Sequence, residues 1–157
     1  MTRRRVVKHY LGIDPGKNGG LCVVDSNGTA LECTRMPDGT ARIIDWLLHA
    51  RERYPNLVMI AELAQAMPKQ GVTSTFRYAR HFATFEVAAI LLRTPYVEVR
   101  PAVWKKAMGL NQKKTDSIAA CRRLFPTVEL IPKGCRTEHD GIAEALLIAE
   151  WGRRKNL

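Results

Sequence analysis

The chain has 157 residues, with 25 Lys and Arg against 15 Asp and Glu, so its formal net charge is +10. This length suits one compact domain and excludes a two-lobed kinase or a large barrel. So large a positive excess predicts a polyanionic partner, most often nucleic acid, although an anionic membrane surface exerts the same attraction.

Apolar extended segments alternate along the chain with segments of helical spacing. A meander of three strands comes first, and helices and strands then follow one another. We expect strands over 8–14, 19–25, 29–36, 57–62 and 96–100, and helices over 41–54, 74–93, 101–108, 116–125 and 139–154. The run over 57–62 is continuously apolar, which is typical of a buried parallel strand. This order predicts an α/β fold with a mixed five-stranded sheet and helices on both faces.

Carboxylates are scarce in this basic chain, so their positions are informative. Asp14 ends the first strand and Glu62 ends the fourth, and ligands of open α/β sheets bind at such strand ends. Asp140 and Glu144 are four residues apart, so they share one face of the last helix. Four carboxylates without an organised His or Cys cluster suit a hard cation, Mg²⁺ or Mn²⁺. Two such ions, about 3.5–4 Å apart, can hold the attacking and leaving oxygens of a phosphodiester.

Each acid also has a simpler interpretation. Asp14 can cap the Pro-Gly turn, Glu62 can pair with an arginine, and Asp140 can be a helix N-cap. Their combination on two strand ends and one helix face favours a metal site over three unrelated structural roles.

Three motifs occur in the order found in a known family. They are GIDPGKNGG at 12–20, AEL at 61–63 and HDGIAEALLIAEWG at 139–152, supported by WKK at 104–106, KTDS at 114–117 and RRLFP at 122–126. Together they resemble the RuvC-like Holliday junction resolvases, in particular the plastid and phage branch, over residues 8–152. The resemblance implies a ribonuclease H-like fold, a homodimer and divalent-metal cleavage of four-way DNA junctions.

The resemblance also implies roles for single residues. Asp14 matches the first-strand aspartate, Glu62 the central glutamate and Glu144 the last acid of the family. The bacterial enzymes have an acid or histidine three residues before that last acid, where this chain has Gly141. The bacterial spacing is therefore not kept.

The altered spacing leaves open whether His139 or Asp140 lies nearer the second metal. His139 either orients a carboxylate or transfers a proton, or it is a structural residue at the helix start. Lys114 matches a family lysine near the active site, where a cation can stabilise the scissile phosphate or orient the attacking water. A solvated lysine ahead of a helix is the alternative. Asp116 and Ser117 are interpreted as capping residues.

Basic and apolar residues close to the acids in the sequence are candidate DNA contacts. They are Lys105, Lys106, Lys113, Lys133 and Arg136 as phosphate ligands, and Met67, Lys69, Gln70 and Phe76 after the central glutamate. Phosphate contacts position a substrate but carry no sequence information. Met67 or Phe76 can wedge into the junction centre and unstack a base, or Phe76 can simply begin the core of its helix.

The helix over 74–93 is apolar around much of its circumference. One face must cover the sheet, and the surplus predicts a two-fold dimer contact, with a wholly intramolecular core helix as the alternative. A two-fold dimer would present two active sites to two symmetric DNA strands, as paired incisions require.

We therefore expect a divalent-metal-dependent endodeoxyribonuclease, with two Mg²⁺ or Mn²⁺ ions per site and no small-molecule cofactor. The rival interpretations are another ribonuclease H-like nuclease acting on RNA–DNA hybrids or branched DNA, and a non-catalytic DNA-binding module. No apolar run approaches the ~20 residues of a bilayer span, and the start lacks a secretory signal. We expect one domain over 1–157, with a basic arm at 1–7, located in the cytoplasm or nucleoid, in a host cytoplasm if phage-encoded, or in an organelle after processing.

Overall fold

The computed structural model describes residues 7–63, 71–111 and 113–157. Within them, one mixed sheet has the strand order β3-β2-β1-β4-β5. The strands are β1 (His9–Asp14), β2 (Gly20–Asp25), β3 (Ala30–Arg35), β4 (Leu57–Glu62) and β5 (Tyr96–Val99). The first three form an antiparallel meander, and β4 and β5 run parallel to β1. The predicted mixed five-stranded sheet is confirmed.

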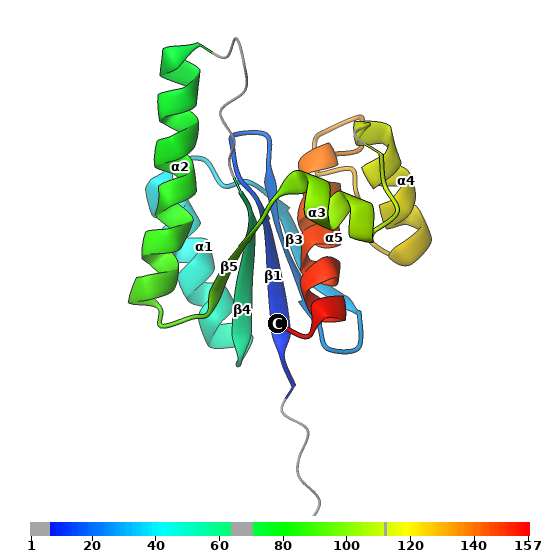
Figure 1. Cartoon of the computed structure of the whole chain (residues 1–157), viewed down its shortest axis with the longest axis horizontal. Coiled ribbons are helices and arrows are strands. Elements are labelled where there is room, and N and C mark those ends of the chain that lie inside the picture. The colour runs from blue at the N-terminus through cyan, green and yellow to red at the C-terminus, as the bar shows by residue number, and fades with distance from the viewer. Residues whose placement is uncertain (1–6, 64–70, 112) are drawn as a thin grey trace, which may run out of the picture.

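Helices cover both faces of this sheet (Figure 1). In the described ranges they are α1 (Thr40–Arg53), α2 (Val72–Leu91), α3 (Pro101–Ala107), α4 (Lys114–Leu124) and α5 (Asp140–Lys155). Because strand side chains alternate between faces, Tyr10 of β1 enters the core under α5, whereas Leu11 enters the core under α1 and α2. The predicted segment ends differ from the observed ones by at most two residues, and the predicted two-sided cover is confirmed. None of the helices in the described part of the chain is both long and apolar enough to cross a bilayer.

The first turns of α5 pack directly on the backbone of β1 and β2. A Cβ at Gly12 would lie 1.9 Å from the carbonyl oxygen of Ala145, and a Cβ at Gly20 would lie 2.7 Å from that of Gly141. Only glycine permits such an approach of helix to sheet. The contact brings the start of α5 to the carboxyl end of β1, where Asp14 lies.

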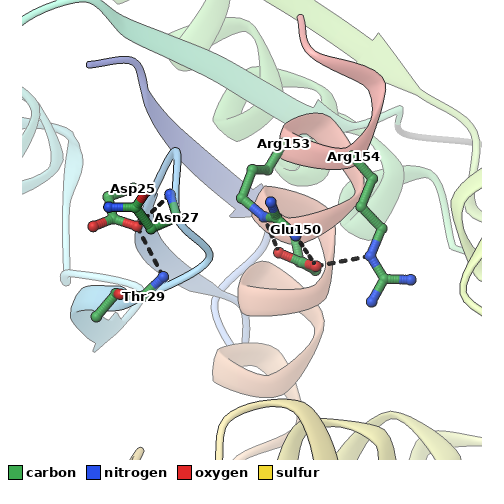
Figure 2. Close-up of polar contacts among 6 residues, drawn as sticks. All are labelled: Asp25, Asn27, Thr29, Glu150, Arg153 and Arg154. Carbon is green, nitrogen blue, oxygen red and sulfur yellow. Dashed lines mark hydrogen bonds and ion pairs between the residues drawn. The ribbon is translucent and has the colours of Figure 1, made fainter. Parts of the chain in front are cut away.

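The last turns of α5 hold a buried acid of purely structural character (Figure 2). The Glu150 carboxylate is 2.7 Å from the Nε atom of Arg153 and 2.7 Å from that of Arg154. Burial raises the pKa of Glu150, but the hydrogen bonds and charges of the two arginines outweigh it and hold that pKa below its usual value. The Asp25 carboxylate instead accepts hydrogen bonds from two backbone N–H groups of the turn after β2. These acids are therefore accounted for by the fold itself.

Candidate metal centre

Three carboxylates meet at the edge of the sheet where β1 and β4 end. Asp14 and Glu62 end these two parallel neighbouring strands, and Glu144 reaches them from α5. One carboxylate oxygen of each residue lies within 4.8 Å of those of the other two. We call Asp14, Glu62 and Glu144 the acidic triad. The strand pairing places the first two side by side, as the sequence predicted.

Asp140 lies beside the acidic triad without belonging to this compact group. It is in the first turn of α5 and lines one open pocket with Asp14, Glu144 and the loop after β1, including the exposed Lys17. The N-cap of α5 is His139, whose Nδ1 accepts the backbone N–H of Ile142 at 3.2 Å. The interpretation of Asp140 as the N-cap is therefore wrong. His139 caps α5, and its role toward a carboxylate or a proton stays a prediction.

Burial and neighbouring like charge raise the pKa values of Asp14 and Glu62. The pKa of Asp14 lies well above its usual value, first because of burial and then because of the charges of Glu144, Glu62 and Asp140. Burial is also the main reason that the pKa of Glu62 is raised, although a hydrogen bond from Trp104 opposes the shift. Unlike Glu150 with its two arginines, these carboxylates meet an excess of negative charge, which a cation would relieve.

Lys105 of α3 supplies positive charge inside this site. Its Nζ atom lies 2.9 Å from Oε1 of Glu144, and the two side chains are only 11% and 12% exposed. Lys105 was predicted to be a phosphate contact on the connection that also carries Lys106. The structure instead directs its ammonium group into the acidic triad, because the helical turn of α3 points residues 104 and 105 inward.

Two neutral side chains orient the triad glutamates. The indole Nε1 of the fully buried Trp104 donates to Oε2 of Glu62 at 2.7 Å, and Oγ of Ser117 donates to Oε1 of Glu144 at 3.2 Å. The interpretation of Ser117 as a capping residue is wrong, because Lys113 is the N-cap of α4 and Ser117 lies one turn further, facing α5. The WKK and KTDS motifs identified the segments of α3 and α4 that contain Trp104 and Ser117, but they did not predict the hydrogen bonds of these residues to the glutamates.

The inner face of α2 also contacts the site, which the sequence analysis missed. The backbone N–H of Gly16 donates to Nδ1 of His81 at 2.9 Å. A Cβ at Gly16, whose φ is +107°, would lie 3.2 Å from the Tyr78 ring. Burial, and then the charges of the acidic triad, raise the pKa of Tyr78, so its hydroxyl stays protonated beside the acids. No local spacing signals a tyrosine in this position, because the contact joins segments more than 60 residues apart.

Gly141 occupies the position that the resemblance to the bacterial resolvases pairs with an acid or histidine. A Cβ there would lie 2.2 Å from the carbonyl oxygen of Asn18 and 2.7 Å from the Cα of Gly19. The loop after β1 therefore leaves no room for any side chain. The departure from the family pattern has a steric cause, and it directs attention to Asp140 as the additional acid.

Most of the other candidate DNA contacts are exposed, and three lie outside the described residues. Lys106, Lys113, Lys133 and Arg136 are exposed, and Lys114 is the first residue of α4. Phe76 is 69% exposed, so the alternative that it begins the core of α2 is wrong. Met67, Lys69 and Gln70 lie outside the described residues.

A divalent metal fits this donor set. The triad offers three carboxylate oxygens close together, and oxygen donors are what hard divalent cations prefer. The pocket beside it, of about 310 Å³, is open and admits a phosphate group or the water ligands of an ion. The sheet order, the two-sided helical cover and the acids at the ends of β1 and β4 define a ribonuclease H-like fold with a carboxylate site.

Two solved RuvC structures share this fold. The structure of T. thermophilus RuvC in complex with a Holliday junction substrate matches with a TM-score of 0.66 and 18% identity, over 94% of this chain and 96% of that one. A second Thermus thermophilus RuvC structure matches with a TM-score of 0.58 and 18% identity over the same shares, 94% and 96%. The predicted RuvC-like, ribonuclease H-like architecture is confirmed.

A nuclease of another kind shares the fold as well. The large terminase nuclease of the thermophilic phage G20c matches with a TM-score of 0.52 and 14% identity, over 93% of this chain and 82% of that one. No family model matches the sequence, and no curated protein matches it. The likeness therefore lies in the fold, and the functional argument depends on the side chains of the site.

Proposed function

We propose that this protein is a structure-selective endodeoxyribonuclease that resolves four-way (Holliday) DNA junctions by paired, metal-dependent phosphodiester hydrolysis. The convergence of Asp14, Glu62 and Glu144 at the carboxyl ends of parallel strands carries this proposal. A non-catalytic DNA-binding module has no use for an acidic cluster that repels DNA phosphates. The net charge of +10 and the shared fold of a RuvC described with a junction substrate support the choice of DNA.

In this proposal the acidic triad and Asp140 hold two Mg²⁺ or Mn²⁺ ions. When bound, such ions lower the pKa of a water nucleophile and stabilise the leaving oxygen. The chain itself supplies rigid positions: Asp14 and Glu62 are fixed by strand backbone, and Trp104 holds the Glu62 carboxylate. The elevated pKa of Asp14 shows that burial and the neighbouring carboxylates oppose its ionised form, and a cation at this position would favour that form.

Basic residues around the site are the proposed phosphate contacts. Lys114 begins α4 on the side of the sheet covered by α5, and Lys113, Lys133 and Arg136 are exposed on the adjoining segments. Lys17, which the sequence analysis did not single out, lines the pocket itself. These contacts would hold a backbone phosphate against the acids without reading its sequence.

The first half of α2 extends past the sheet at the edge where the loop after β1 lies (Figure 1). Phe76, Arg77 and Arg80 are exposed there. An exposed aromatic side chain with two exposed arginines following it on the same half of the helix is suited to unstack a base at the junction centre while the arginines contact phosphates. We propose this role for Phe76.

The second half of α2 carries an exposed apolar face. Val87, Ile90 and Leu91 are 53%, 70% and 75% exposed. Large apolar side chains gathered on one surface favour association, and two copies related by a two-fold axis would place two sites on one junction. We propose that this face is the homodimer contact.

The decisive assay incubates the protein with a synthetic mobile four-way junction and Mg²⁺. Symmetric nicks that leave ligatable duplexes are expected, with little cutting of linear duplex or RNA–DNA hybrid. Equal cutting of hybrid and junction would favour the rival hybrid nuclease, and equal cutting of linear duplex would favour a general nuclease of the terminase kind. Asp14→Asn is the matched control, and we expect it to bind the junction without cutting it.

A further inference from the structure

Two neighbouring residues of α3, Trp104 and Lys105, contact the acidic triad, and their side chains differ in flexibility. Trp104 is fully buried and bonded to Glu62, so it anchors the helix. Lys105 reaches Glu144 through a flexible four-carbon stem, with its Nζ atom 5.2 Å from the centre of the Trp104 ring. The ammonium group can therefore leave Glu144 by rotation of its own side chain, without movement of α3.

The atom that Lys105 contacts is one that a metal needs. Oε1 of Glu144 accepts both the ammonium group of Lys105 at 2.9 Å and the hydroxyl of Ser117 at 3.2 Å. Bound donors on a carboxylate oxygen compete with a cation for its lone pairs. A metal cation held by the triad would also repel the nearby ammonium group of Lys105.

We propose, on the basis of the function proposed above, that Lys105 is a placeholder for the metal. In the metal-free protein its ammonium group neutralises Glu144 and holds the acidic triad together. When a divalent ion binds the triad, the ammonium group leaves Glu144 and turns toward the open pocket, where the substrate phosphate lies. The ammonium group of Lys105, displaced from Glu144, can then contact a phosphate of the DNA backbone.

A second role for Lys105 makes the opposite prediction. If Lys105 instead positions Glu144 and stays bound to it in the metal-loaded protein, removing the lysine weakens metal binding. If Lys105 is a placeholder, removing it strengthens metal binding while it destabilises the metal-free fold. The sign of the change in Mn²⁺ affinity therefore separates the two roles.

The test uses the full chain without DNA and measures Mn²⁺ binding by isothermal titration calorimetry and thermal unfolding in EDTA. For Lys105→Met we expect a lower Tm in EDTA and a Kd for Mn²⁺ about tenfold lower than that of the wild type. Lys105→Gln, which keeps a polar group next to Glu144, is expected to change Kd in the same direction and remains usable if the methionine variant does not fold. Lys106→Met is the matched control, since Lys106 is exposed on the same helix, and we expect neither measurement to change.

The interaction with Glu144 can be isolated with a double-mutant cycle. In a Glu144→Gln background, Lys105→Met is expected to have no further effect on the Tm in EDTA. A higher Kd for Mn²⁺ in both Lys105 variants would overturn the placeholder role and support the positioning role. An equal gain in Lys106→Met would also overturn it, because the effect would then come from net charge. Absence of Mn²⁺ binding to the wild type would overturn the proposed function itself.

Discussion

Asp14→Asn should stabilise the metal-free protein while it removes cleavage. The Asp14 carboxylate is half-buried beside Glu62 and Glu144, and burial and like charge both raise its pKa. An amide at this position carries no charge to bury and can donate hydrogen bonds to the neighbouring carboxylates. The fold is therefore expected to gain free energy of unfolding from a change that destroys the site.

The magnitude follows from the spacing of the acidic triad. Two full charges 4.8 Å apart repel by about 3.5 kcal/mol at an effective dielectric constant of about 20. Lys105 offsets part of this repulsion, and proton uptake by Asp14 offsets another part. We expect a net stabilisation of about 1–3 kcal/mol at pH 8, which for a chain of this length is a rise in Tm of about 3–8 °C.

The stabilisation should depend on pH with a defined sign. Because the pKa of Asp14 is higher in the folded protein than in the unfolded chain, the folded state binds more protons, and its stability falls as pH rises through the folded-state pKa. Below the usual pKa of an aspartate, about 4, the penalty disappears. The gain in Tm from Asp14→Asn is therefore expected to be small near pH 4 and to grow toward pH 8.

Calorimetry or circular dichroism melts in EDTA between pH 4 and pH 8 measure this difference directly. Added Mn²⁺ should then reverse the order at pH 8, because the wild type gains stability from the bound cation and the variant gains less. A lower Tm for Asp14→Asn at pH 8 in EDTA would refute the reasoning, since it would mean that the fold already satisfies this carboxylate.

Three further changes test other parts of the structure. Gly141→Ala should lower the free energy of unfolding by about 3 kcal/mol or more, since its Cβ would lie 2.2 Å from a carbonyl oxygen, whereas Gly71→Ala, with nothing within 4 Å, should change it little. Equal melting temperatures for both variants would contradict the steric account. Ile90→Glu on the exposed face of α2 should convert a dimer to a monomer in sedimentation velocity, whereas Leu48→Glu, at an exposed position of α1, should leave the dimer intact. An unchanged mass for Ile90→Glu would exclude this face as the contact. Ser117→Ala should cost about 1 kcal/mol of stability by removing a buried hydrogen bond to Glu144; an unchanged melting temperature would deny it an orienting role.

Local patterns in the sequence were sufficient to predict most of the fold. The continuous apolar run over Leu57–Glu62 and the turn signals around the first three strands identify elements whose periodicity is set by burial on one or both faces. The two acids at strand ends were likewise predictable, because parallel neighbours end at the same edge of a sheet.

The contacts that complete the site were beyond local reasoning. Tyr78, His81 and Ser117 have no spacing that distinguishes them from ordinary helical residues. Tyr78 and Ser117 reach the acids, and His81 reaches the loop after β1, only through the packing of α2 and α4. Lys105 was predicted to contact DNA phosphates because the basic residues of its segment flank the acids in the sequence. The excess of carboxylates around it reverses that expectation, since a buried ammonium group there has a partner.

Anomalous diffraction from crystals of the wild-type protein soaked in Mn²⁺ would locate the ion itself. We expect Mn²⁺ density bonded to carboxylate oxygens of Asp14, Glu62 and Glu144 together. Saturating Mn²⁺ with no anomalous density at these three side chains, or with the ion bound elsewhere, would contradict this expectation.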